Sequence, residues 1–186
     1  GGVGLYPNLP SGTFSVNVPG TPVTAYWYWT GRSDVPPHSN DPDIVVTVSG
    51  GSTQTLTASQ SHTATPIFQF VWHANMYEDV GASLIQPNGV TTFTVSGLDI
   101  NPGAANPEDH GAGIVVVYES PSCPFQKIEF SFGNDAFHWS WPGDFGPDSA
   151  PYCTIFEPTP TSRNLSIDMV VGGVAGQDRG NNLWYT

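Results

Sequence analysis

Proline and glycine occur along the whole chain and limit the folds that it can form. The 186 residues include 18 prolines and 21 glycines, and the prolines run from one end of the chain to the other. Proline inside a helix costs about 3 kcal/mol because it removes a hydrogen bond and clashes with the preceding turn. Lys127 is the only lysine, so helix-favouring residues are also scarce. The sequence therefore predicts a chain without long helices.

The stretches between the prolines and glycines have sequence patterns that are typical of β-strands. Residues 13–18 and 91–95 alternate apolar and polar side chains, which indicates half-buried strands. Residues 114–118 are continuously apolar, which is typical of a central strand. Residues 23–30 form an aromatic strand with large side chains on both faces, and residues 49–52 form a hairpin turn between two strands. The strands expected elsewhere are residues 44–48, 53–58, 67–73, 126–132, 152–156, 165–171 and 181–186.

About ten short strands separated by turns predict an all-β chain. We expect an antiparallel β-sandwich with jelly-roll-like connectivity. We expect one domain over residues 1–186, with residues 1–12 as an extended N-terminal segment. A short helix is plausible only near residues 78–85, where two acids precede three apolar residues.

The charge balance excludes one class of partner. Sixteen acidic residues against four basic ones give a formal charge of −12, which leaves no basic surface for a nucleic-acid backbone. No apolar run approaches the roughly 18 residues of a membrane span. The abundant aromatic and β-branched residues are atypical of disorder. The chain begins with Gly1, which we interpret as a processed chain or a fragment whose targeting segment is gone.

Two features favour an extracellular or cell-surface location. Cys123 and Cys153 form an even pair in a lysine-poor β-chain, which favours a disulfide bond over the alternative of two buried free thiols. The sequence from Asn164 to Ser166 fits the glycosylation pattern, with Asn164 as the acceptor. That pattern is common by chance and is weak when taken alone.

Several short motifs occur in a fixed order. They are AYWYWTG at residues 25–31, YEDV at 77–80, TFTVSGL at 92–98, EDHGAGIVVVYE at 108–119 and GNDAF at 133–137. This order resembles the DUF3344-like domains of secreted prokaryotic surface proteins, whose function is unknown. The resemblance covers about residues 20–186 and implies a secreted, β-rich domain, often within a cell-surface protein. The chain departs from the family pattern at residues 133–135 and at Gln177, which replaces an acid.

Tryptophan side chains are candidates for a ligand platform or an interface. Sugars stack on such rings, although the same rings more often fill a core or a subunit contact. A glycoside hydrolase would also need two carboxyl groups at a set separation, for which Glu119 and Glu129 are the candidates. The candidate platform residues are Trp27, Trp29, Trp139, Trp141 and Trp184.

Loop carboxylates and amides are candidate ligands for a structural calcium ion, because calcium prefers oxygen donors. The alternative is a solvated acidic surface. The candidate ligands are Asp41, Asp43, Asn106, Glu108, Asp109, Asn134 and Asp135.

Other chemistry has weaker support. The five histidines are scattered without zinc-ligand spacing, and no Gly-x-Ser-x-Gly motif occurs. An isopeptide crosslink would need Lys127, which strand alternation directs to solvent.

The sequence therefore predicts a protein that is not an enzyme and requires no cofactor. We expect a structural subunit of a filament, pilus-like fibre or surface layer, whose partners are copies of itself or other surface proteins. Residues 1–10 and 181–186 would carry the contacts, either by pairing within their own sheet or by donation to a neighbour. The alternative is a calcium-supported carbohydrate-binding or adhesin module, and a glycoside hydrolase is the third reading.

Overall fold

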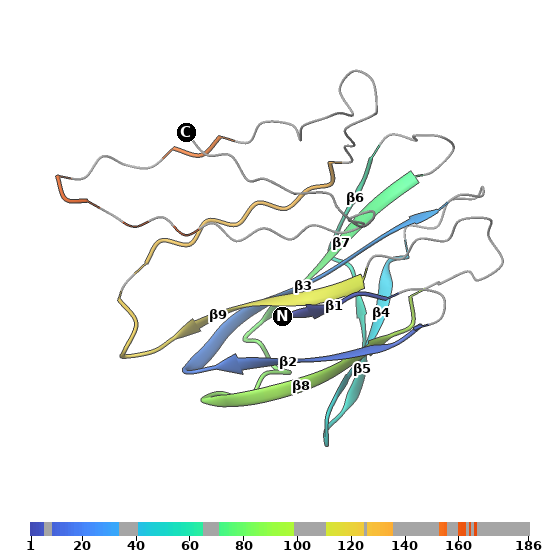
Figure 1. The fold of residues 1–186 in the computed structure, drawn as a ribbon, viewed down its shortest axis with the longest axis horizontal. Helices are drawn as coiled ribbons and strands as arrows, with labels where there is room; N and C mark the ends of the chain where they lie inside the picture. The colour runs from blue at the N-terminus through green and yellow to red at the C-terminus, as the bar shows by residue number, and fades with distance from the viewer. Residues whose placement is uncertain are drawn as a thin grey trace, which may run out of the picture.

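A computed structural model describes residues 1–5, 9–33, 41–64, 71–98, 111–124, 126–135, 153–155, 160–162, 164 and 166. These residues contain nine strands and no helix (Figure 1). The strands are β1 (Gly2–Val3), β2 (Gly12–Val18), β3 (Thr21–Ser33), β4 (Asp43–Val48), β5 (Thr53–Thr57), β6 (Gln60–Thr63), β7 (Val71–Val80), β8 (Gly89–Ser96) and β9 (Gly111–Glu119).

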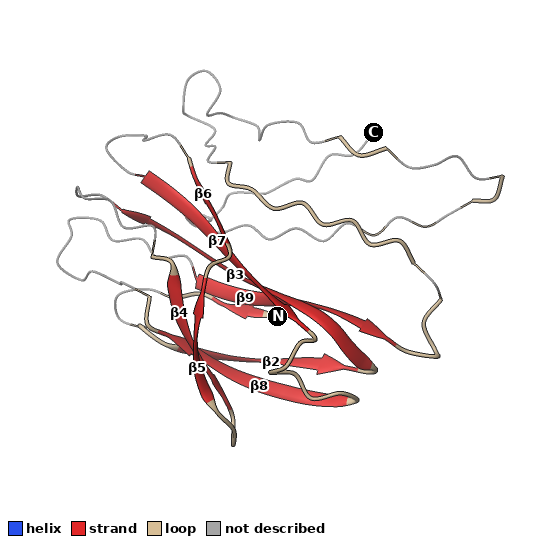
Figure 2. Ribbon diagram, turned by 180° about the vertical axis from the view of Figure 1, so that it is seen from behind, coloured by secondary structure: helices blue, strands red, loops and turns tan. Residues whose placement is uncertain are grey.

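The strands form two antiparallel sheets that pack face to face (Figures 1 and 2). The first sheet has five strands in the order β1-β9-β3-β7-β6, and the second has four in the order β2-β8-β4-β5. The prediction of an all-β antiparallel sandwich is therefore confirmed. Within the described residues no helix could cross a membrane.

The strand pairs are nested along the chain. β4 pairs with β5 through the hairpin turn expected at residues 49–52, β3 pairs with β7, β2 pairs with β8, and β1 pairs with β9. Each outer pair thus encloses the next pair in the sequence. Non-local pairs of this kind bring the first and last described strands side by side.

The core lies between the two sheets, where alternate side chains of each strand meet. Trp27 and Trp29 of β3 and Phe93 of β8 have no exposed surface. The rings of Trp27 and Phe93 meet edge to face, with centroids 4.9 Å apart. Phe14 of β2 packs against both of these rings. These aromatic contacts join the two sheets.

Three expected elements are absent from the described residues. The strand expected at residues 152–156 is one of them, since residues 153–155 belong to no described strand. Residues 78–85 form no helix, because Glu78 and Asp79 continue β7 in register with Tyr26 and Ala25 of β3. Pairing with a neighbouring strand outweighs the local capping pattern at this position. Residues 126–132 were expected to be a strand, but they belong to no described strand.

The described residues 126–135, which follow β9, form a further layer. Residues 126–135 run across the outer face of the five-stranded sheet, on the side away from the four-stranded sheet (Figures 1 and 2). Asn134 fixes one end of this segment, since its Nδ2 donates to the carbonyl oxygen of Trp72 at 2.9 Å. The five-stranded sheet is therefore covered on part of both faces.

Candidate interaction surfaces

Trp27 and Trp29 do not form an exposed platform. Both are fully buried in the core, so the prediction of an interface or ligand platform is wrong for these two residues. Strand alternation directs them inward, and the Nε1 of Trp29 donates to the carbonyl oxygen of Asp41 at 2.7 Å. Three further candidates, Trp139, Trp141 and Trp184, lie outside the described residues and stay predictions.

The candidate calcium ligands are engaged in protein contacts where the structure describes them. The carbonyl oxygen of Asp41 accepts hydrogen bonds from Trp29 and from the Nδ2 of Asn75. The Oδ1 of Asp43 accepts from the hydroxyl of Thr57 at 2.6 Å. Within the described residues no three His, Cys, Asp or Glu side chains gather around one point.

Of the remaining calcium candidates, two are described by the structure and three are not. Asn134 donates its amide to the Trp72 carbonyl group, and the neighbouring Asp135 is exposed. The loop residues Asn106, Glu108 and Asp109 lie outside the described ranges. The calcium site therefore stays a prediction.

The two glutamates considered for hydrolysis have different surroundings. Glu129 accepts a hydrogen bond from the hydroxyl of Thr154 and lies 3.8 Å from the Nζ of Lys127. Glu119 is the exposed last residue of β9, opposite Thr21 of β3. The side chain of Lys127 is 67% exposed, although residues 126–132 form no strand that could alternate. In the structure, Glu129 thus has one partner on its own segment, Lys127, and one on a separate stretch, Thr154.

Cys123 and Cys153 are exposed free thiols in the structure, which therefore does not contain the expected bridge. The disulfide stays a prediction, and titration of free thiols in the denatured protein tests it. Asn164 is exposed, as a glycosylation acceptor must be. Whether the acceptor is used is likewise a prediction.

The N-terminal segment pairs within its own domain. Gly2 lies opposite Gly113 of β9, and Gly1 exchanges two hydrogen bonds with Ile114, at 3.0 and 2.8 Å. A Cβ atom at position 113 would collide with the hydroxyl of Tyr28 and the carbonyl oxygen of Gly1, so glycine is what allows β1 to approach. In the structure, the first three of residues 1–10 therefore pair within their own sheet. Residues 181–186 lie outside the described ranges.

The outer face of the four-stranded sheet carries ordered hydroxyl groups. Thr13, Thr94, Thr47 and Thr53 lie directly opposite one another on the four neighbouring strands and form one row across the sheet. Their hydroxyls bond in two pairs, Thr13 with Thr94 and Thr47 with Thr53, each at 2.9 Å. This surface presents short polar groups and few charges.

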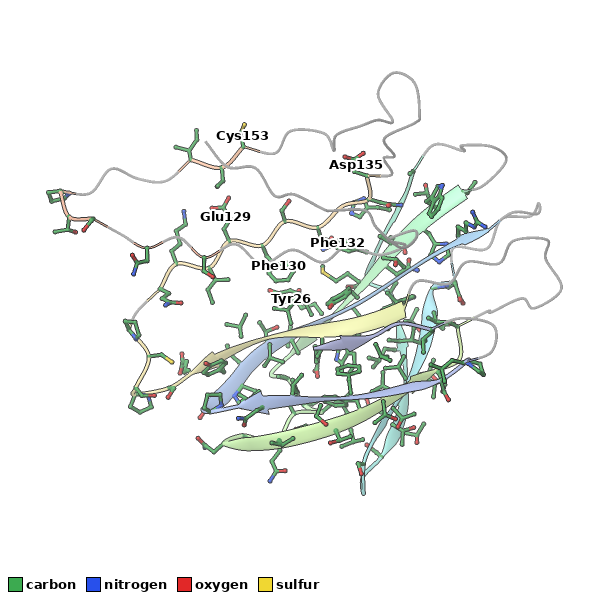
Figure 3. All side chains as sticks on the ribbon, viewed as in Figure 1. Tyr26, Glu129, Phe130, Phe132, Asp135 and Cys153 are labelled. Atoms are coloured by element: carbon green, nitrogen blue, oxygen red, sulfur yellow. The ribbon has the colours of Figure 1, made fainter. Side chains whose placement is uncertain are left out.

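The outer face of the five-stranded sheet is aromatic. Because Trp27 and Trp29 point inward, Tyr26 and Tyr28 point outward. Phe130 stacks on Tyr26 with ring centroids 4.4 Å apart, and Phe132 packs edge-on against His62 at 5.1 Å. Figure 3 shows Phe130 directed toward Tyr26 and Glu129 directed away from the sheet.

Apolar side chains remain exposed on this outer layer. Phe130 is 42% exposed despite its stacking, and Ile128 and Ile155 are 59% and 89% exposed. A free protein gains about 25 cal/mol for each Å² of such surface that a partner covers. The exposed apolar side chains of this outer layer therefore form a surface suited to protein contact.

Three of the four edge strands are short or covered. β1 has only two residues. The edge of β2 is flanked by the N-terminal segment, where Gly1 lies against Phe14, Ser15 and Val16. β6 has only four residues, and Asn134 also donates to the carbonyl oxygen of its His62 at 3.4 Å.

The edge of β5 is open. No other described strand pairs with it, and four of its five residues are exposed. The strand reads Thr-Gln-Thr-Leu-Thr, without charge or proline, and its pairing with β4 is continuous. Sequence reasoning placed a strand here but missed its role as an edge, because position within a sheet follows from the long-range pairing of β4 with β8.

Two other features are less suited to a site. A hollow of about 260 Å³ beside the β4–β5 turn is lined by Val48, Ser49, Leu84, Gln86, Val90, Thr91 and Thr92, none of which is charged. His73 of β7 is buried, and burial lowers its pKa to about 4. Among the described residues its Nδ1 has no hydrogen-bond partner, so the ring is a neutral part of the interior at neutral pH.

No protein-family model, curated protein or solved structure matches this chain.

Proposed function

We propose that this chain is a non-enzymatic structural subunit of an extracellular or cell-surface assembly, such as a filament, a pilus-like fibre or a surface layer. The observation that carries the proposal is the open edge of β5. The subunits join through strand edges, and the apolar outer layer over the five-stranded sheet supplies a second contact.

An open edge supports assembly for a general physical reason. It presents backbone N–H and C=O groups in the spacing of a sheet, so another chain can add a strand there. Monomeric proteins commonly block such edges with lysine, proline, a bulge or a very short strand. β5 carries none of these features, whereas β1 is very short.

The exposed apolar residues support the same function. Ile128, Phe130 and Ile155 lie in stretches outside the two sheets and keep 59%, 42% and 89% of their surface exposed. Interfaces are enriched in aromatic and aliphatic anchors of this kind. An extracellular location fits the low lysine content and the expected disulfide.

We also propose that the sandwich is a jelly roll. A jelly roll consists of two sheets formed by antiparallel strand pairs that are nested along the chain and rolled up together. The four nested pairs that run from β4–β5 outward to β1–β9 support this connectivity. β6 is then an added strand at the edge of the five-stranded sheet.

The test of the proposed function is the assembly state of the purified chain. Electron microscopy should show fibres or two-dimensional arrays, and sedimentation should show mass that increases with concentration. A protein that remains a single monomeric species at all concentrations, with no ordered particles, would contradict the proposal. Saccharide-array binding by such a monomer would favour the adhesin module instead.

A further inference from the structure

The open edge of β5 has a regular set of unpaired backbone groups. The N–H of Val48 donates to the carbonyl oxygen of Ser52, and the N–H of Ala58 donates to the carbonyl oxygen of Pro42. Bonded and non-bonded residues alternate along an antiparallel pair. Gln54 and Leu56 therefore direct their backbone groups toward β4, whereas the threonines at 53, 55 and 57 direct theirs away from the sheet.

We propose that β5 pairs with β5 of a second copy of this chain, antiparallel and centred on Thr55. This inference rests on the proposed function and names its contact. In this register, Thr55 lies opposite the partner's Thr55, and Thr53 lies opposite the partner's Thr57. Each of the three resulting pairs exchanges two backbone hydrogen bonds. The contact uses the same patch on both copies, as a two-fold interface requires.

The occupant is a second copy because the edge is complementary to itself. Its sequence, Thr-Gln-Thr-Leu-Thr, has threonine at both ends and at the centre, so antiparallel pairing places threonine opposite threonine. The leucine of each copy, Leu56, stays on the core side and is buried in the single chain. The threonines at 53, 55 and 57 point outward, so the threonine-bearing outer face of the four-stranded sheet continues across the contact between the two copies.

Charge favours this edge as the place of contact. A chain with a formal charge of −12 repels its own copies over most approaches. The β5 strand is uncharged, and the nearest strand acid in register, Asp43, lies one strand away and bonds to Thr57. Two copies can thus meet here without opposing carboxylates.

The experiment uses charge substitutions at the centre of the seam. Thr55→Lys and Thr55→Glu place like charges directly opposite each other in a dimer of one variant, and opposite charges in a mixture of the two. The side chain at position 55 is exposed, so both variants should fold as the wild type does. Thr55→Pro removes one outward N–H, and Thr55→Val is the matched control that keeps this group.

Below the concentration at which fibres or arrays form, analytical ultracentrifugation should show a monomer–dimer equilibrium for the wild-type chain. The dissociation constant should increase about tenfold or more for the Lys, Glu and Pro variants, and it should be unchanged for Val. Mixing the Lys and Glu variants should restore the dimer. The amide of Thr55 should exchange more slowly with solvent as protein concentration rises.

Two results would overturn the inference and are distinguishable. If the wild type assembles but none of the variants changes its assembly, the β5 edge is not the contact and the proposed function stands. If the wild type is monomeric throughout and forms no ordered particles, the proposed function fails together with the contact.

Discussion

The two sheets share one core but have different outer faces. The five-stranded sheet has Tyr26 and Tyr28 on its outer face, and residues 126–135 run across it. The four-stranded sheet has rows of threonine and serine on its outer face, and its edge strand β5 is open. The alternation of side chains along each strand decides which residues face outward. An apolar outer face favours a covering layer, whereas an outer face with hydroxyl groups is stable in water.

The largest expected effect is on the core that both sheets share. Trp27→Ala should lower the free energy of unfolding by about 3–5 kcal/mol, because it leaves a cavity against Phe93. Urea denaturation followed by circular dichroism measures the change. A loss below about 1 kcal/mol would mean that Trp27 is a surface residue and that the sandwich is packed differently.

The next effect is specific to the five-stranded sheet and depends on pH. The pKa of His73 is lowered to about 4 by burial, against an ordinary value of 6.5 in the unfolded chain. Between pH 4 and pH 6.5 the unfolded state binds more protons than the folded state. The contribution of His73 to the free energy of unfolding should therefore be fully present above pH 6.5 and should decrease as the pH falls toward 4.

His73→Gln should flatten this part of the profile, measured as the denaturation midpoint between pH 7 and pH 4. Carboxylates titrate in the same range in both proteins, so the difference between them isolates His73. Parallel profiles for the two proteins would show that His73 is not buried in neutral form.

A smaller effect tests the layer over the aromatic face. Phe130→Ala and Tyr26→Ala should each destabilise the protein, and a double-mutant cycle should give a coupling energy of about 0.5–1.5 kcal/mol from the stacked rings. Additive changes would show that residues 126–135 do not rest on this face in solution.

The smallest effect is expected on the hydroxyl face. Thr94→Ala removes one exposed hydroxyl pair with Thr13 and should change the free energy of unfolding by about 0.5 kcal/mol or less. The same denaturation measurements, with Trp27→Ala as the reference, provide the comparison. A loss as large as that at Tyr26 would mean that the two outer faces contribute equally to folding.

Part of this structure follows from local sequence patterns. The alternation at residues 13–18 and 91–95 gave β2 and β8 nearly as observed, and the glycines at 50 and 51 gave the β4–β5 hairpin. These predictions succeed because the period of a strand and the conformation of a turn depend on neighbouring residues.

Other predictions depended on contacts that are distant in the sequence. The aromatic strand at residues 23–30 has large side chains on both faces, so the sequence alone did not distinguish core from platform for Trp27 and Trp29. Pairing with β7 and β9 makes β3 a central strand, and its inner face is then sealed by β8. The same long-range pairing turned Glu78 and Asp79 from a helix start into strand residues.

The sequence by itself determined that the chain is all-β. Its 18 prolines and 21 glycines exclude long helices, and the alternating stretches between them supply strands. Only the tertiary structure decided which strand faces which neighbour, and so which threonines remain at an open edge. The physical reason is that side-chain alternation is local, whereas the order of strands in a sheet is set by pairing between residues far apart in the chain.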